Sequence, residues 1–461
     1  MVIIINPTEQ ALNQLLREAE NFRKHIQTLP LQIIEEFYKL LETAAKAASS
    51  NIKNVDPELR VSLCALLDEV LERIVDLKPA LAPSGKTIGI YTPAIQGYRR
   101  WTNTELLKDK GLAGYMLAKT LGEGAQPTMY FVTRPSDYAY LSVMPGLNIL
   151  YDTESMGSPQ VYYNHLIQNY HKMDVLVLHG MYEQTIGFLD AYRKLRPDGK
   201  VYCGLDMNSY WMANIDWEHP LVQKFSAQCD VVATSCTSLR DALNRNPKVN
   251  FACRWLPNGF WNATGEVIKA DAAQKENVIL TVGRIGERQK NNAELLIGFA
   301  KAANFMPGWT LRLVGPIAPD FQQVIDQFYA QFPSLRDRVV FTGPITDKTE
   351  LYREYARAKI FVLTSVAEGG TPNVYAEALF HGCMFVTSNI DAADDITGYG
   401  TLGRKYTLGN TDELAKALTD LSREADSPAM QVHISNAVEY ARKYYDWNRN
   451  ARKLAYMLYQ A

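Results

Sequence analysis

Residues 365–383 combine a glycine-rich turn with the start of a helix, and they follow an apolar strand over 360–363. Thr371 and Pro372 form a good helix-opening pair, and Gly382 predicts where that helix ends. A helix start preceded by glycines presents backbone N–H groups and the positive end of the helix dipole. Both features favour a phosphate group, so the pattern predicts an anion site at this turn.

Two carboxylates lie on either side of the turn, Glu368 at the strand exit and Glu377 inside the helix. Carboxylates accept hydrogen bonds from hydroxyl groups and N–H donors bind phosphate, so the combination suits a sugar nucleotide. The alternative is an ordinary strand–turn–helix with solvated glutamates. The residues predicted to form the site beside the two acids are Gly369, Gly370, Thr371, Pro372 and Asn373.

A second segment repeats this arrangement with cationic side chains. A predicted strand over 278–282 is followed by Gly283, Arg284 and Lys290, and then by a predicted helix over 293–302. The Arg guanidinium is a planar fork and the Lys ammonium is a point charge, and both bind phosphate oxygens. The two segments together predict a site for a diphosphate.

These segments, with the turn at 255–259, resemble the retaining glycosyltransferases of family 4. The resemblance covers roughly residues 86–461 and is strongest over 250–400. It implies the GT-B fold, an α/β architecture in which two Rossmann-like domains face a cleft, here preceded by a small all-α region. It also implies a hexosyl transfer in glycan biosynthesis from a nucleotide-diphosphate sugar, with no metal or other cofactor.

The resemblance gives each charged residue of the two segments a role. Arg284 and Lys290 hold the diphosphate, Glu368 lies near the sugar, and Glu377 accepts hydrogen bonds from the ribose hydroxyls. The family usually has seven residues between the two glutamates, whereas this chain has eight because of an extra glycine. The role of Glu377, which is anchored by its helix, depends less on that extra residue than the role of Glu368.

The resemblance also places residues outside these segments. The backbone of the turn at Thr342 and Gly343 is expected to face the nucleotide base. A long aromatic loop follows the first predicted strand, where the family has its acceptor-side turn, and it either binds the acceptor or packs on its own domain. Its candidate residues are Gly97, Tyr98, Arg99 and Trp101.

Two further polar groups, His179 and Asp206, directly follow predicted strands. Ligands of open α/β sheets bind at the carboxyl ends of strands, so both residues are candidates for the acceptor side. Many members of the family carry a His in the catalytic region where this chain has Asp206. An Asp can bond a sugar hydroxyl or accept its proton, so Asp206 joins Arg284, Lys290 and Glu368 as a predicted catalytic residue.

Composition excludes several other classes of protein. The chain of 461 residues has a formal charge of −2, which gives no basic footprint for nucleic acid. No stretch approaches the roughly 20 apolar residues of a membrane span, and no leader is expected. The six cysteines form no Cys-x-x-Cys pair, so we expect reduced core thiols and a cytoplasmic location, or one at the membrane surface. The absence of an Asp-x-Asp pair argues against the metal-dependent GT-A glycosyltransferases.

Residues 1–83 show only helical periodicity, which predicts an all-α region. After Lys86, predicted strands alternate with predicted helices, and this alternation predicts parallel sheets. The predicted domains are 1–83, 84–264 with the closing helix 444–461, and 265–443. The predicted strands are 87–91, 129–132, 175–178, 201–205 and 231–234, then 278–282, 311–314, 339–342, 360–363 and 384–387. The region 1–83 is expected to be a cap on the next domain, or else a surface for self-association or docking.

Other functions remain open at this point. A GT-B sugar-nucleotide epimerase would use similar phosphate loops without an acceptor, and a glycan phosphorylase would need a cofactor lysine that the chain does not offer. A catalytically degenerate subunit that supports an active partner would explain the altered glutamate spacing and the missing His. The acceptor can be a glycan, a lipid-linked molecule or a protein.

Overall fold

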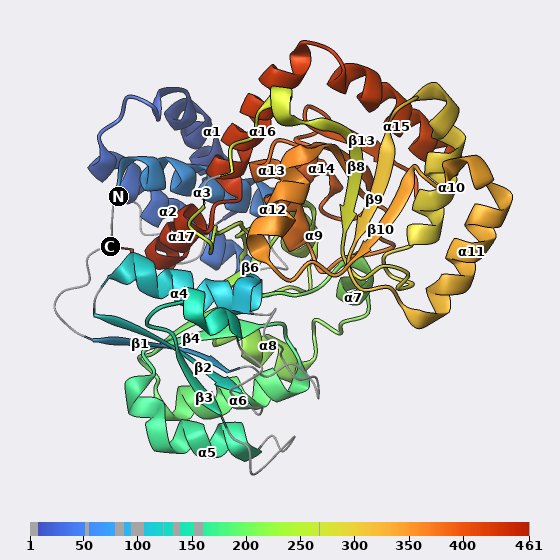
Figure 1. Ribbon diagram of the computed structural model, residues 1–461. Helices are drawn as coiled ribbons and strands as arrows, with labels where there is room; N and C mark the ends of the chain where they lie inside the picture. Colours follow the sequence, from blue (N-terminus) through green and yellow to red (C-terminus); the bar gives the residue numbers. More distant parts are fainter. Residues whose placement is uncertain are drawn as a thin grey trace. The chain divides into compact units, whose positions relative to one another are not determined.

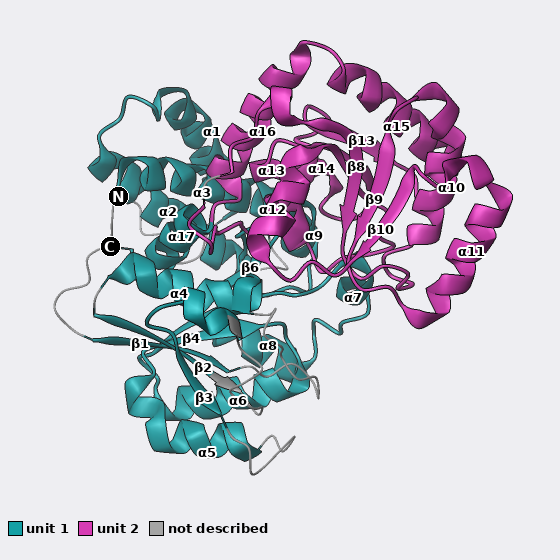
Figure 2. Cartoon of the chain, in the orientation of Figure 1, with its two compact units in different colours: residues 1–257, 447–461 teal, residues 258–446 magenta. Residues whose placement is uncertain are grey.

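The computed structural model describes residues 8–50, 55–78, 87–93, 106–122, 124–131, 139–151, 160–266 and 268–460. The chain divides into two compact units (Figure 2). Unit 1 comprises residues 1–257 and 447–461, and unit 2 comprises residues 258–446. The chain therefore passes from one unit to the other twice.

Unit 1 contains a sheet of seven strands in the order β3-β2-β1-β4-β5-β6-β7. All of its pairs are parallel. The strands are β1 (Ile88–Pro93), β2 (Ala125–Phe131), β3 (Asn148–Tyr151), β4 (Val175–His179), β5 (Lys200–Gly204), β6 (Val231–Thr234) and β7 (Cys253–Trp255). The accompanying helices are α4 (Asp109–Leu121), α5 (Gln160–Asn169), α6 (Glu183–Leu195), α7 (Ser209–Ala213), α8 (Pro220–Ala227), α9 (Thr237–Arg245) and the C-terminal α17 (Trp447–Tyr459).

Unit 2 contains a parallel sheet of six strands in the order β10-β9-β8-β11-β12-β13 (Figure 1). The strands are β8 (Glu276–Val282), β9 (Thr310–Val314), β10 (Val339–Gly343), β11 (Ala358–Leu363), β12 (Met384–Ser388) and β13 (Gly403–Tyr406). The helices are α10 (Asn292–Ala302), α11 (Gln322–Gln331), α12 (Lys348–Arg357), α13 (Asn373–Phe380), α14 (Ala393–Ile396), α15 (Thr411–Ala425) and α16 (Ala429–Tyr444).

Helices cover both faces of the unit 2 sheet. Successive residues of a strand point to opposite faces, and each face packs against its own set of helices. Ile279 of β8 packs in one cluster with residues of α10, α11 and α15. Leu280, the next residue, packs in another cluster with residues of α12, α13 and α16. This is the doubly wound arrangement, with the strand order that Rossmann-like domains adopt.

The two parallel sheets with their helices confirm the expected GT-B fold, and the expected N-terminal helical region is present. Its helices are α1 (Glu9–His25), α2 (Leu31–Ser50) and α3 (Pro57–Leu77). Asp56 caps α3 by accepting a hydrogen bond from the Glu58 backbone at 2.9 Å, and Pro57 occupies the first turn. The strands that the sequence did not predict, β3, β7 and β13, all lie at sheet edges, and each has only three or four residues.

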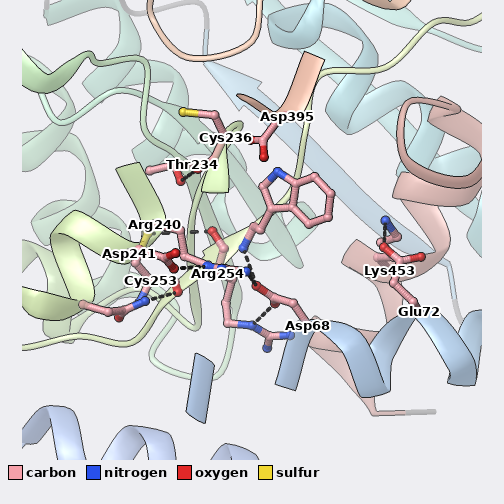
Figure 3. A network of polar contacts seen from close by, with 12 residues as sticks. Asp68, Glu72, Thr234, Cys236, Arg240, Asp241, Cys253, Arg254, Asp395 and Lys453 are labelled. Carbon is pink, nitrogen blue, oxygen red and sulfur yellow. Dashed lines mark hydrogen bonds and ion pairs between the residues drawn. The ribbon is translucent and has the colours of Figure 1, made fainter. Parts of the chain in front are cut away.

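Buried charges join the helical region to the rest of unit 1 (Figure 3). Asp68 of α3 accepts hydrogen bonds from Arg240 at 3.1 Å and from Arg254 at 2.7 Å. It also accepts one from the backbone N–H of Trp255 at 3.1 Å. One turn further along α3, Glu72 pairs with Lys453 of α17. The helical region is thus packed on the sheet and on α17 of unit 1.

Among the described residues, no helix combines the length and the apolar character that crossing a membrane requires.

Candidate functional site

The two predicted phosphate loops lie next to each other at the carboxyl edge of the unit 2 sheet. The strands that precede them, β8 and β11, are paired in parallel. The strand order changes direction at this pair, because β9 and β10 extend the sheet on one side and β12 and β13 on the other. Ligands of doubly wound sheets bind outside the strand ends at such a switch point.

Hydrogen bonds fix the two loops to each other. The backbone N–H of Val366 donates to the Gln289 carbonyl at 2.8 Å. The Thr364 hydroxyl donates to the carbonyls of Lys290 and Asn291, at 2.9 and 3.1 Å. Asn291 has a φ of 49°, in the left-handed region, which turns the chain into α10. The side chains that the loops carry therefore stand in a fixed relation.

Glu368 and Lys290 are in direct contact. The Glu368 side chain is only 10% exposed, and its Oε1 forms an ion pair with Lys290 Nζ. The same oxygen accepts a hydrogen bond from Ser365 Oγ at 2.5 Å. Gln289 Nε2 lies 3.4 Å from the other oxygen. The cation predicted to bind phosphate and the acid predicted to lie near the sugar are thus brought together.

Arg284 extends from the same loop with 53% of its side chain exposed. Its guanidinium lies 3.5 Å from the Glu287 carboxylate and donates to Gln289 Oε1 at 3.3 Å. Gln289 in turn donates to the Ala367 carbonyl at 2.8 Å, so it spans the two loops. A phosphate would offer the guanidinium shorter, bidentate bonds than these. Gly283, the residue before Arg284, donates its N–H to the Val314 carbonyl at 2.9 Å.

The helix after the second loop begins later than predicted. α13 starts at Asn373, and its N-cap is Pro372, which has an extended ψ of 138° and no capping side chain. The prediction that Thr371 caps the helix is therefore wrong. Thr371 is buried one residue earlier, and its carbonyl accepts a hydrogen bond from Asn258 at 2.8 Å. The turn that precedes it needs glycine, since Gly370 has a φ of 90°. Gly369 lies between Glu368 and this turn.

Glu377 lies in the second turn of α13, and its side chain is 14% exposed. Tyr355 donates its hydroxyl to Glu377 Oε2 at 2.7 Å. Lys348 Nζ lies 3.4 Å from Oε1. Both partners come from α12.

The turn at Thr342 and Gly343 ends β10, at the same edge of the sheet. Gly343 has a φ of 75°, and its carbonyl accepts a hydrogen bond from Gly315 N–H at 3.0 Å. Thr342 Oγ1 donates to that carbonyl at 2.9 Å. The Thr342 hydroxyl therefore donates its hydrogen bond within the turn itself.

In unit 1, His179 is the last residue of β4, and Asp206 lies two residues after β5, the strand paired with β4. Lys110 Nζ lies 3.4 Å from Asp206 Oδ2. Burial raises the pKa of Asp206, and the charges of Lys110 and His179 oppose that shift. A partly buried carboxyl with a raised pKa is suited to accept a proton. The other acceptor-side candidates, Gly97, Tyr98, Arg99 and Trp101, lie outside the described residues.

Several residues of these contacts were not predicted from the sequence, among them Lys110, Gln289, Lys348, Tyr355 and Ser365. Gln289 adjoins a predicted phosphate ligand, so its place in the loop was a usable signal. Tyr355 is separated from Glu377 by 22 positions along the chain, and nothing in the local pattern connects the two.

Residues 276–424 match a family model described as glycosyl transferases group 1. This segment contains Arg284, Lys290, Glu368 and Glu377. None of the curated proteins compared with the chain matches it.

Several solved structures share the fold. Sucrose-phosphate synthase from Thermosynechococcus elongatus has a TM-score of 0.61 at 18% identity, over 81% of this chain and 98% of its own. HepE of Anabaena, in complex with UDP, has a TM-score of 0.59 at 16% identity, over 81% of this chain and 100% of its own. A glycosyltransferase from Rickettsia africae has a TM-score of 0.60 at 13% identity, over 82% of this chain and 100% of its own. At these identities the likeness shows the fold alone.

Proposed function

We propose that this chain, whose residues 276–424 match the group 1 glycosyltransferases, is a glycosyltransferase that uses a nucleotide-diphosphate sugar. The observation that carries the proposal is the contact between Lys290 and Glu368 at the switch point of unit 2. A cation for phosphate oxygens and a carboxylate for sugar hydroxyls thereby occupy one site.

In this proposal Arg284 and Lys290 stabilise the negative charge that develops on the departing diphosphate. Fixed charges directed at such a group lower the free energy of the transition state by on the order of several kcal/mol. This is usually the largest single contribution to catalysis. Transfer proceeds with retention by front-face attack, with Asp206 accepting the proton of the acceptor hydroxyl. Because the cations belong to the chain itself, the reaction needs no metal or cofactor, and its rate should survive EDTA.

UDP is the donor nucleotide to test first, because HepE, which shares the fold, was solved with UDP. The transferred group is a hexosyl unit, and the acceptor is a glycan, a lipid-linked molecule or a protein. The six cysteines are reduced thiols, which supports a cytoplasmic or membrane-surface location. Self-association through residues 1–83 stays a prediction, which light scattering tests.

A second candidate is a degenerate GT-B subunit that supports an active partner. It is favoured by the eight residues between Glu368 and Glu377, and by Asp206 at the position of the family's His. An epimerase would also cleave or rearrange the donor, but it would have no use for an acceptor.

The test is nucleoside-diphosphate release from UDP-, GDP- and ADP-sugars by the purified full chain, with and without acceptor mixtures. We expect release from one donor class, stimulation by acceptor, and retained anomeric configuration by NMR. Lys290→Ala should lower the rate of release about 10² to 10³-fold, whereas Lys301→Ala, which removes an exposed lysine paired with Asp412, should leave it unchanged. Release from no donor would favour the degenerate subunit. Conversion of the donor sugar without transfer would favour the epimerase.

A further inference from the structure

Helix α12 holds the carboxylate of Glu377 from two sides. Lys348 begins the helix and Tyr355 lies seven residues later, so both project from the same face two turns apart. Lys348 Nζ lies 3.4 Å from Oε1, and the Tyr355 hydroxyl donates to Oε2 at 2.7 Å. Each carboxylate oxygen therefore has one partner from the chain.

A carboxylate offers about four lone-pair sites, two on each oxygen. Lys348 and Tyr355 use one on each oxygen, which leaves one on each for another donor. The Glu377 side chain is 14% exposed, so those positions are not sealed by the chain. Two vacant acceptor positions on adjacent oxygens match two neighbouring hydroxyl groups, as on a ribose ring.

The Tyr355 hydroxyl stays protonated, and the packing of its ring holds it in place. Burial and the charge of Glu377 raise the pKa of Tyr355 well above its usual value, so the hydroxyl keeps its proton. The Tyr355 ring stacks on His381, with centroids 5.9 Å apart and planes 17° apart. His381 Nδ1 donates to the Glu377 carbonyl at 2.6 Å, which joins the stack to the helix that carries the acid.

Resting on the proposed function, we infer that Tyr355 and Lys348 are positioning residues that make Glu377 select donor nucleotides with intact ribose hydroxyls. Without them the carboxylate would rotate, or would turn its free lone pairs away from the ribose. The effect acts on the sugar of the nucleotide, so it should disappear when a ribose hydroxyl is absent.

The test compares the affinity of UDP with that of 2′-deoxy-UDP by calorimetry, using ADP or GDP pairs if the wild-type chain prefers another base. For Tyr355→Phe we expect the nucleoside diphosphate to bind about tenfold more weakly and the deoxy analogue to be almost unaffected. The matched control is Tyr329→Phe, which removes a hydroxyl bonded to the Val339 carbonyl at 2.7 Å, elsewhere in unit 2. It should change neither affinity.

Two further variants complete the test. Tyr355→Phe should have no added effect in a Glu377→Gln background, because the carboxylate that it positions is gone. Lys348 is partly exposed, and Lys348→Met should reduce the same ratio of ribose to deoxyribose affinity even if Tyr355→Phe fails to fold.

Two outcomes would overturn the inference in different ways. If the wild type prefers the ribonucleotide and both variants keep that preference, the positioning role is wrong and the proposed function stands. If the wild type binds no nucleoside diphosphate, the proposed function fails, and the inference fails with it.

Discussion

Replacing Asp68 with asparagine removes the negative charge that two buried guanidinium groups share. Asp68 has 5% of its side chain exposed, and its partners Arg240 and Arg254 have 7% and 5%. The carboxylate accepts from both, and from the backbone of Trp255 (Figure 3). Asparagine has nearly the same volume but only one acceptor oxygen, so it can replace either the oxygen that faces Arg254 or the one that faces Arg240 and Trp255, and it cannot balance the charge.

The expected loss follows from burial. Removing one partner of a buried ion pair costs about 3–5 kcal/mol, because the remaining charge is left uncompensated. No cavity adds to this, since the side chains are almost isosteric. We therefore expect about 3 kcal/mol for Asp68→Asn, a large part of the 5–15 kcal/mol or so that stabilises a domain. Glu69→Gln, on the same helix, is the control. Its ion pair with Arg23 is exposed and should be worth less than about 1 kcal/mol.

Urea unfolding followed by hydrogen–deuterium exchange measures the two units separately. Peptides from β7 and α9 report on unit 1, and peptides from β11 report on unit 2. Asp68→Asn should lower the unfolding midpoint in the first set alone, and Glu69→Gln should shift neither. Equal, small shifts for both variants would show that the Asp68 network adds nothing beyond a surface pair.

Three further predictions concern unit 2. Lys290→Ala and Arg284→Ala should each lower turnover about 10² to 10³-fold, because one charged contact to the leaving diphosphate is worth on the order of 2–4 kcal/mol; wild-type rates would refute the assignment. By calorimetry, Glu377→Gln should weaken the binding of free nucleoside diphosphate, whereas Glu368→Gln should leave it nearly unchanged and reduce transfer; the reverse pattern would exchange their roles. Burial lowers the pKa of His381 from 6.5 to about 4, so the unfolded chain binds more protons between these values. His381 should therefore lower the unfolding free energy of unit 2 as pH drops through this range, by about 3 kcal/mol, and His381→Gln should remove this share of the fall in pH-dependent urea titrations.

Local patterns determined much of the fold. Asp56 and Pro57 set the start of α3, because capping acts within a few residues. The inner strands of both sheets were predicted from apolar runs that are buried on both faces. The edge strand β13, Gly403–Tyr406, carries no such run, and its pairing with β12 defines it instead.

In the candidate site, too, local sequence and long-range packing determined different things. The residue types around Lys290 and Glu368 indicated phosphate and hydroxyl chemistry, because charge and hydrogen-bonding capacity belong to each residue alone. Their contact spans 78 positions and depends on β8 pairing with β11. The partners of Asp68 lie 172 and 186 residues away, so in the sequence it is only one acid on a helix. Sequence by itself determined which groups the chain carries. Tertiary structure decided which of them meet, because burial and long-range pairing arise only when distant segments pack together.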